Sequence, residues 1–500
     1  MLTFILQLFF SFFLLLFPLI ILSIFRSPKT SPNLPKSYPI IGHYFDLKAN
    51  WNRRAQWISS ILQNSPSATF TLFHPTGGRR IVTGNPANVQ HILKTRFHNY
   101  QKGNDFRTIL SDFLGNGIFN ADGDTWKFQR QIASHEFNTK SLRKFIETVV
   151  DTELSRRLIP ILSSAAKTRE IIDFQDVLQR FMFDNICQIA FGYDPQYLLP
   201  SLPEEKFARA FEDGVRISSE RFNSLLWKIR RFFNVGSERK LREAVAEVRD
   251  FAVKLVKEKK GELKTEKSIE SVDLLSRFLS SGHSDEKFVT DIVISFIIAG
   301  RDTTSAALTW FFWVLSENPD AETEIINEIT EKSETETPVF EEVRSMVYTH
   351  AALCESMRLY PPVPADTKFA EDDDVWPDGT AVKKGTAVTY HPFAMGRLAM
   401  LWGSDWAEYK PERWLRRDGD SGKWSFVGRD AYTYPVFQGG PRICLGKEMA
   451  FLQMKRVVAG VLSKFKVVPV MEPGVEPEFY SYLTAKMRGG FPVRIEERVM

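Results

Sequence analysis

Residues 292–315, IVISFIIAGRDTTSAALTWFFWVL, form a long apolar run with two adjacent charges, Arg301 and Asp302, near its centre. A helix of this length would cross a bilayer, but each central charge would cost about 2.5–3.5 kcal/mol. We therefore interpret the run as a helix buried within protein. Residues 284–286, SDE, provide a helix start, and Pro319 provides a stop. Because the helix is apolar on nearly all sides, it is expected to run through the middle of the fold.

The rest of the chain mixes long helical patterns with short β-like pieces, and helices predominate. The β-like pieces include residues 69–73 and 381–390. Polar segments rich in helix-breaking residues are expected to be surface connections. They span residues 261–285, 331–338 and 416–431. The expected fold class is mainly α with small β-sheets. Motifs on both sides of these connections are expected to serve one site, which favours a single domain over residues 43–500.

Composition excludes several classes of protein. The formal net charge is +4, from 65 basic and 61 acidic side chains spread along the chain, so the sequence has no basic stripe that would bind nucleic acid. The three cysteines, Cys187, Cys354 and Cys444, are far apart. An odd, scattered set argues against a disulfide framework and for a reducing compartment. Any special role for a cysteine is therefore that of a thiol, a thiolate or a metal ligand.

The N-terminal residues 2–25 carry no charge and are long enough to span about 30 Å of hydrocarbon as a helix. A secretory signal would have positive charge before the apolar run and a small-residue cleavage site after it, and the sequence has neither. We therefore expect a transmembrane anchor at residues 1–26. Arg26 and Lys29 follow the span, which predicts that the rest of the protein is cytosolic. Prolines make residues 27–42 a semi-rigid hinge.

The central run is interrupted at residues 299–304, AGRDTT. Glycine costs about 1 kcal/mol in a helix relative to alanine, and threonine is a mediocre helix former. One explanation is a helix bent by threonine bonding back to the carbonyl four residues earlier, with the charges reaching a loop. The other is a local opening beside a ligand, where Gly300 admits a flat group and Asp302 with Thr303 handles protons. The residues alone leave both explanations open.

Two weaker patterns place paired side chains on one face of a helix. Glu355 and Arg358 are three residues apart, and Arg413 follows in the kinked segment YKPERW. A buried network of these three would hold a loop in place, whereas an exposed pair would contribute little. Trp126 and Arg130 are four residues apart, which suits an indole and a guanidinium that reach one carboxylate, although a surface pair is the simpler explanation.

Cys444 lies in the segment FQGGPRICLG, the cysteine loop, which is too irregular for an ordinary helix or strand. A free cysteine is most often a small buried hydrophobe. Here Gly440 and Gly446 would let backbone amides turn toward the sulfur, and Arg442 is near, so a thiolate would be stabilised. The sequence has no second cysteine or histidine at zinc-like spacing. A lone thiolate of this kind suits the axial ligand of haem iron.

Together these motifs resemble those of the cytochrome P-450 haem-thiolate monooxygenases. The chain matches every defined position of that family's cysteine loop, namely Phe437, Gly440, Arg442, Cys444 and Gly446. Residues 299–304 resemble its oxygen-activation helix, and Glu355 with Arg358 resembles its structural pair. Trp126 with Arg130 is similar to the helix that grips a haem propionate. One departure is Trp414, where many members have phenylalanine, and we expect it to leave the role of Arg413 unchanged.

The resemblance implies the cytochrome P-450 fold, with haem b between the long central helix and the cysteine-loop helix. Cys444 would bind the iron, and Asp302 and Thr303 would deliver protons to dioxygen. The other residues implied to bind the cofactor are Arg442, Trp126, Arg130, Phe437 and Gly446. Electrons would come from NADPH through NADPH–cytochrome P-450 reductase, with Lys447, Lys455 and Arg456 as candidate contacts. The protein would be a single-pass protein of the endoplasmic reticulum membrane, with its catalytic domain in the cytosol.

Stretches such as GNGIFNADGDTWKFQRQIASHEF resemble the plant fatty-acid ω-hydroxylases of family 94. The resemblance implies hydroxylation of fatty acids at or near the ω carbon, in plant lipid metabolism of the cutin type, while sister subfamilies oxidise jasmonoyl-isoleucine. Lys102, Arg107 or Lys368 would hold the substrate carboxylate, and residues 483–486 would be part of the channel lining. A non-redox haem-thiolate isomerase and a haem-based sensor remain alternatives, although neither needs Asp302 and Thr303.

Overall fold

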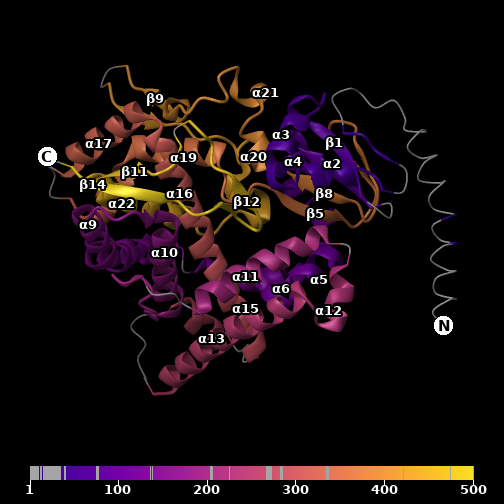
Figure 1. Cartoon of the computed structure of the whole chain (residues 1–500), viewed down its shortest axis with the longest axis horizontal. Coiled ribbons are helices and arrows are strands. Elements are labelled where there is room, and N and C mark those ends of the chain that lie inside the picture. Colours follow the sequence, from indigo (N-terminus) through magenta and orange to yellow (C-terminus); the bar gives the residue numbers. More distant parts are fainter. Residues whose placement is uncertain are drawn as a thin grey trace. The chain divides into compact units, whose positions relative to one another are not determined.

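The computed structural model describes most of the chain after residue 34 (Figure 1). The described residues are 11, 14, 35–38, 41–74, 78–135, 137, 139–202, 206–224, 226–265, 273–281, 285–333, 337–419, 422–472 and 474–498. Apart from residues 11 and 14, the anchor predicted at residues 1–26 lies outside the described residues, as does much of the predicted hinge. The chain divides into two compact units, each described separately below. Unit 1 comprises Met1–Gln101 and Ala365–Trp406, and unit 2 comprises Lys102–Pro364 and Ala407–Met500.

Unit 1 is built on a five-stranded sheet. Its strands, in spatial order, are β1 (Thr69–Phe73), β2 (Arg79–Thr83), β8 (Ala387–Tyr390), β5 (Asp366–Ala370) and β3 (Tyr100–Gln101). β2 and β8 pair in parallel, and the other pairs are antiparallel. The strand predicted at residues 69–73 is confirmed as β1. The piece predicted at 381–390 is instead divided between β7 (Ala381–Val382) and β8, since a turn with Gly385 at a φ of +76° separates them.

Helices cover part of this sheet and complete the core of unit 1. They are α2 (Tyr44–Ala49), η1 (Trp51–Arg53), α3 (Arg54–Gln63), α4 (Pro86–Gln90), η3 (His91–Thr95), η4 (Phe97–Asn99), α20 (Pro392–Met395) and α21 (Ala399–Trp402). Ile58, Ile61 and Leu62 of α3 share a buried apolar cluster with Phe70 and Leu72 of β1. This packing follows the i, i+3, i+4 spacing of a helix against the i, i+2 spacing of a strand. β6 (Asp374–Val375) pairs with β7 as a small hairpin.

Unit 2 is mostly helical. Its first helices are α5 (Gly103–Leu114), α6 (Gly123–Ser134), α7 (Thr139–Lys144), η5 (Phe145–Val150), α8 (Asp151–Glu153), η6 (Leu154–Leu158), α9 (Ile159–Thr168), α10 (Phe174–Phe191), α11 (Lys206–Glu220), η7 (Arg221–Asn223), α12 (Trp227–Phe233), α13 (Ser237–Thr265) and α14 (Leu274–Ser280). The later ones are α15 (Glu286–Ile297), η8 (Ile298–Asp302), α16 (Thr303–Ser316), α17 (Pro319–Ser333), α18 (Val339–Ser345), α19 (Val347–Leu359), η9 (Pro411–Trp414), η10 (Pro435–Phe437), η11 (Gly440–Arg442) and α22 (Lys447–Leu462). The predicted predominance of helix is confirmed.

Small sheets complete unit 2. β4 (Ile172–Asp173) and β11 (Phe465–Pro469) flank β14 (Pro492–Glu497), β12 (Phe479–Ser481) pairs with β13 (Ala485–Met487), and β9 (Leu415–Arg417) pairs with β10 (Trp424–Phe426). The connection predicted at 416–431 therefore contains a hairpin. The one predicted at 261–285 is wrong in part, because α13 continues to Thr265 and α14 follows, capped by the Asp273 side chain.

The central apolar run forms a continuous helix made of α15, η8 and α16. It starts where the Asp285 side chain accepts a hydrogen bond from the Lys287 amide, and it ends at Ser316, shortly before Pro319. The helix is long and apolar enough to cross a membrane, yet its most apolar window is 83% buried inside the protein. The prediction of a helix buried in protein is therefore confirmed.

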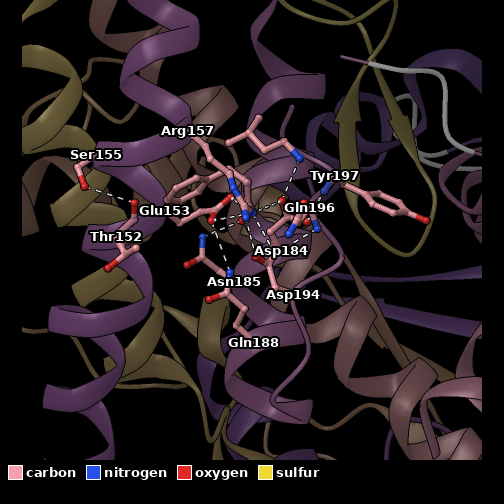
Figure 2. A network of polar contacts seen from close by, with 12 residues as sticks. Thr152, Glu153, Ser155, Arg157, Asp184, Asn185, Gln188, Asp194, Gln196 and Tyr197 are labelled. Atoms are coloured by element: carbon pink, nitrogen blue, oxygen red, sulfur yellow. Dashed lines mark hydrogen bonds and ion pairs between the residues drawn. The ribbon is translucent and has the colours of Figure 1, made fainter. Parts of the chain in front are cut away.

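A buried polar network links the helical segment α8–η6 to α10 (Figure 2). Arg157 contacts Glu153, Asp184 and Asp194, with the shortest nitrogen–oxygen distances at 3.0, 3.3 and 2.5 Å. The Tyr197 amide donates to Asp184 at 2.9 Å, so the loop after α10 is held by the same carboxylate. Three carboxylates thus share one guanidinium. Desolvation, together with the neighbouring charge of Asp184, raises the pKa of Glu153 to about 8.

Candidate haem site

The cysteine loop closes by one backbone hydrogen bond. The Cys444 amide donates to the Phe437 carbonyl oxygen at 2.8 Å. Gly440 has a φ of +63°, as predicted for a glycine in this bend, but Gln438 is also at +64°, which nothing in the sequence signalled. Gly446 has an ordinary φ of −86° and lies at the start of α22, and its amide bonds to the Cys444 sulfur, as predicted. The loop therefore places Cys444 just before the first turn of α22.

The Cys444 side chain is exposed, yet the surrounding protein desolvates its sulfur enough to raise the pKa of the thiol. A hydrogen bond from the Gly446 amide and the positive charges of Arg130 and Lys447 act in the opposite direction. Arg442, the cation expected to stabilise a thiolate, is not among these groups. Because the net direction is upward, the protein alone does not favour the thiolate. A coordinated metal ion deprotonates a thiol ligand by its own charge.

Three of the predicted cofactor-binding side chains lie together in unit 2. The Arg442 guanidinium carbon is 4.5 Å from the centroid of the Trp126 ring, and that of Arg130 is 6.0 Å from it. Arg442 also donates through Nη2 to Asp122 Oδ1 at 2.7 Å and to the Ala121 carbonyl at 3.0 Å. Asp122 is a partner that the sequence analysis missed. Its position directly before α6 was the only available signal.

Arg130 is the side chain that best tests whether haem b fits. It is half-buried, and within the described part of the chain it forms no ion pair with a carboxylate. Burial lowers the pKa of its guanidinium, and Cys444 partly offsets this. A partly desolvated cation favours an anionic partner. Haem carries two propionates and an iron that accepts a thiolate, so Arg130, Trp126 and Cys444 fit it.

A buried ion network fixes the segment that precedes the cysteine loop. Glu355 of α19 accepts hydrogen bonds from Arg358 at 2.7 and 2.8 Å, and from Arg413 at 3.1 Å. Glu355 and Arg358 are 0% and 1% exposed. The predicted network of these three residues is therefore confirmed. Trp414 adds a bond that was not predicted, because its indole nitrogen donates to Glu355 at 2.9 Å.

The interruption of the central helix shows a threonine that bonds back to the helix and a local widening of the backbone. Residues 298–302 form a wider, π-helical segment, η8, and the Thr303 hydroxyl donates to the Ala299 carbonyl at 2.6 Å. A Cβ on Gly300 would lie 2.5 Å from Cγ1 of Ile186 in α10. A side chain at this position would therefore clash with a neighbouring helix, which is a reason for the glycine that the sequence did not indicate.

Asp302 is fully buried, and its two oxygens differ. Oδ1 accepts from Arg301 Nη1 at 2.9 Å and lies 3.5 Å from Lys486 Nζ. Oδ2 is buried and, among the residues that the structure describes, has no hydrogen-bond partner. A buried carboxylate oxygen without a donor is unusual, and it marks a position where a further hydrogen-bonding group is expected. Lys486, predicted to line a channel, is instead committed to this ion cluster.

Other predicted cations have less freedom than the sequence suggested. The ammonium of Lys368 is buried and bonded to Asp366 at 2.8 Å. Lys455 is also buried and donates to the Arg344 carbonyl at 3.2 Å, while Arg456 pairs with Asp151. Of the three candidate reductase contacts, only Lys447 is exposed.

Comparison with known proteins gives a consistent picture. The family model described as Cytochrome P450 matches residues 32–488. The chain is 65% identical to cytochrome P450 94A1 of Vicia sativa over 93% of its length and 91% of the relative's, and 64% identical to cytochrome P450 94A2 of the same plant, over 95% and 93%. It is 48% identical to cytochrome P450 94B1 of Arabidopsis thaliana, over 97% of both chains.

Proposed function

Because this chain belongs to the cytochrome P450 family, and within it to subfamily A of plant family 94, we propose that it hydroxylates fatty acids at or near the ω carbon. As a cytochrome P450 it is a monooxygenase that binds haem b and receives electrons from a redox partner. When bound, haem b supplies the dioxygen chemistry. The protein's part is to hold the cofactor, exclude water and choose which carbon is oxidised.

The observation that carries this proposal is the similarity to subfamily A, at 64–65% identity, against 48% for the subfamily B relative. The resemblance of the sequence to the fatty-acid ω-hydroxylases points the same way.

We place Cys444 as the ligand of the haem iron, with Arg130, Arg442 and Trp126 toward the propionates. Asp302 and Thr303 are the pair that handles protons. The electron donor is NADPH–cytochrome P-450 reductase, for which Lys447 remains an exposed contact. The protein is anchored in the endoplasmic reticulum membrane by residues 2–25, with its catalytic part, proposed as one domain over residues 43–500, in the cytosol.

For the substrate carboxylate we propose Arg107. Lys368 is a poor candidate because Asp366 already neutralises its ammonium. Arg107 is half-buried at the edge of the apolar face of α5, next to Phe106, and within the described residues no carboxylate pairs with it. A guanidinium in that position would bind a carboxylate in two hydrogen bonds and orient the chain inward.

The test uses microsomes that contain the full-length protein with reductase and NADPH. A panel of saturated and unsaturated fatty acids and jasmonoyl-isoleucine is supplied, and mass spectrometry locates the new oxygen. Oxygen at or near the terminal methyl of a fatty acid is expected. Products from jasmonoyl-isoleucine alone, or no NADPH-dependent product from either class, would overturn the proposal. The Cys444→Ser protein is the negative control.

A second experiment tests Arg107. For Arg107→Leu, the KM for lauric acid should rise about tenfold, the equivalent of about 1.4 kcal/mol, while the KM for its methyl ester stays within twofold. Arg107→Lys should restore part of the affinity for the acid. Arg239→Leu, an exposed arginine on α13, is the matched control and should change neither value. Equal changes for acid and ester would show that Arg107 does not bind the carboxylate.

A further inference from the structure

Asp302 belongs to a cluster of four charged side chains that come from three separate elements of unit 2. Arg301 and Asp302 lie in η8, Glu212 in α11 and Lys486 in β13. Arg301 Nη2 is 2.9 Å from Glu212 Oε1, and Lys486 Nζ is 2.5 Å from the same oxygen. Both cations also contact Asp302 Oδ1, at 2.9 and 3.5 Å. One oxygen of each acid thus meets both cations.

The cluster is electrically balanced and mostly buried. Two positive and two negative groups sum to zero, and the side chains of Asp302, Arg301 and Lys486 are 1%, 5% and 9% exposed. Only Glu212 reaches solvent, with 40% of its side chain exposed. Although burial acts to raise the pKa of Glu212, Lys486 and Arg301 outweigh it and lower that pKa to about 2. Removing one member would leave an uncompensated buried charge, which is costly.

The backbone around Lys486 is held on both sides. The Ala485 carbonyl accepts from the Trp310 indole at 3.1 Å, and the Ala485 amide donates to the Pro362 carbonyl at 2.8 Å. On the other side, the Gln175 side chain exchanges two hydrogen bonds with Met487, at 2.9 and 3.1 Å. The strand therefore presents Lys486 from a fixed position, so its ammonium is aimed before any ligand binds.

Arg301 is held as firmly. Its Nη2 donates to Gln179 Oε1 of α10 at 3.3 Å, and its guanidinium carbon lies 5.2 Å from the centroid of the Phe211 ring. Phe211 precedes Glu212 in α11, so one turn of that helix contacts the guanidinium through both a ring and a carboxylate. These contacts leave Arg301 one orientation, with Nη1 on Asp302.

We propose that Arg301 and Lys486 are positioning residues that clamp Oδ1 of Asp302, so that Oδ2 alone takes up and gives up protons, and that Glu212 holds the clamp from α11. In each cycle Oδ2 accepts one proton from a water or hydroxyl group and passes one proton on, so Asp302 returns to a carboxylate. The clamp places two cations on one oxygen of a buried carboxylate and leaves the other oxygen available for proton transfer.

This inference rests on the proposed function where it is tested by product formation. Its second test, by hydrogen–deuterium exchange, does not depend on the proposed function. Lys486→Met keeps the length of the side chain and removes its charge, which leaves two acids sharing Arg301. Oδ1 of Asp302 then keeps only one of its two cationic contacts, so the carboxylate is no longer held in one orientation. Product formed per NADPH should fall about tenfold, a fraction of the 10²–10⁴ that acid–base catalysis typically contributes. Substrate affinity from spectral titration should stay within twofold.

Hydrogen–deuterium exchange of the full-length holoprotein supplies the readout that is independent of turnover. In Lys486→Met, peptides covering residues 206–220 and 296–305 should exchange faster, because the link between α11 and η8 is weakened. Lys486→Arg should restore at least half of both losses. Glu212→Gln, which keeps the residue's shape and solvent contact, should give a smaller loss of product per NADPH and faster exchange in the same two peptides.

The matched control is Lys259→Met. Lys259 is also a buried lysine between two acids, at 2.8 Å from Glu262 and 3.1 Å from Asp273, in contacts that do not involve Asp302. It should leave product per NADPH and the two peptides unchanged. Equal behaviour of Lys486→Met and wild type, or equal losses in Lys486→Met and Lys486→Arg, would overturn the proposal. If the wild-type protein oxidises no fatty acid, the proposed function is wrong. The hydrogen–deuterium exchange data would still show whether Lys486 links α11 to η8.

Discussion

Replacing Glu153 by glutamine removes one of the three carboxylates that share Arg157 (Figure 2). Glu153 is 3% exposed, and Asp184, which also carries a pKa raised by burial, lies beside the same guanidinium. Glutamine has the same shape as the protonated acid and keeps the contact to Gln188. The variant therefore separates the effect of the Glu153 charge from the effect of its packing.

The sign of the effect follows from the pKa of Glu153, which is about 8 in the folded protein against 4.5 ordinarily. Between these values the folded state binds more protons than the unfolded state, so the free energy of unfolding falls as pH rises. A difference of about 3.5 units at about 1.4 kcal/mol each gives about 5 kcal/mol as the upper limit. Asp184 and Asp194 lie beside the same guanidinium, so the three carboxyl groups titrate together. We therefore expect Glu153 alone to account for about half of this free energy of unfolding.

The assay compares Glu153→Gln with wild type by thermal unfolding of the purified holoprotein at pH 5.5, 7.0 and 8.5. At pH 5.5 the two should unfold within a few degrees of each other. At pH 8.5 the variant should be the more stable, by about 2 kcal/mol. Glu243→Gln, in an exposed pair with Arg239, is the control and should show no such trend. A constant difference across pH, or a variant that weakens as pH rises, would mean that Glu153 is ionised throughout.

Two further predictions concern the scaffold of the site. Glu355→Gln should destabilise the protein by about 3–5 kcal/mol and lower haem retention on gel filtration, since Arg358 loses its buried partner; retention equal to wild type would contradict a structural role. Gly300→Ala should destabilise the protein by about 1–3 kcal/mol through overpacking against Ile186, and Ile186→Ala should relieve this in the double variant. Additive effects in that cycle, measured by denaturant unfolding, would show that the two residues are not in contact.

Much of the fold was predictable because its signals are local. The apolar run of residues 292–315 indicated a buried helix, and β1 followed from a short β-like stretch. The Glu355–Arg358–Arg413 network was compatible with the helical spacing of its first two members, and it was expected from the resemblance to the family's structural pair. The buried helix and β1 need only local periodicity and the conformational limits of proline.

Other features were missed because they depend on partners far away in the sequence. Glu212 carried no motif, and it became notable only when α11 brought it to Arg301 and Lys486. The reason for Gly300 stayed open because the sequence does not indicate which side chain lies against it, and that side chain is Ile186. Lone charged residues are mostly solvated, so such a cluster has no signature before the chain is folded.

Asp122 makes the beginning of α5 and the cysteine loop interdependent. Its carboxylate accepts hydrogen bonds from the Lys102 amide at 3.1 Å and from the Gly103 amide at 3.4 Å. The same carboxylate accepts a hydrogen bond from the Arg442 side chain. Because the two donors at the start of α5 are backbone amides, the side chains that have to be matched in chimaeras with a relative are residues 122 and 442. A chimaera in which residues 122 and 442 no longer match would bind the cofactor less well, even where the exchanged segment ends far from Cys444 in the sequence.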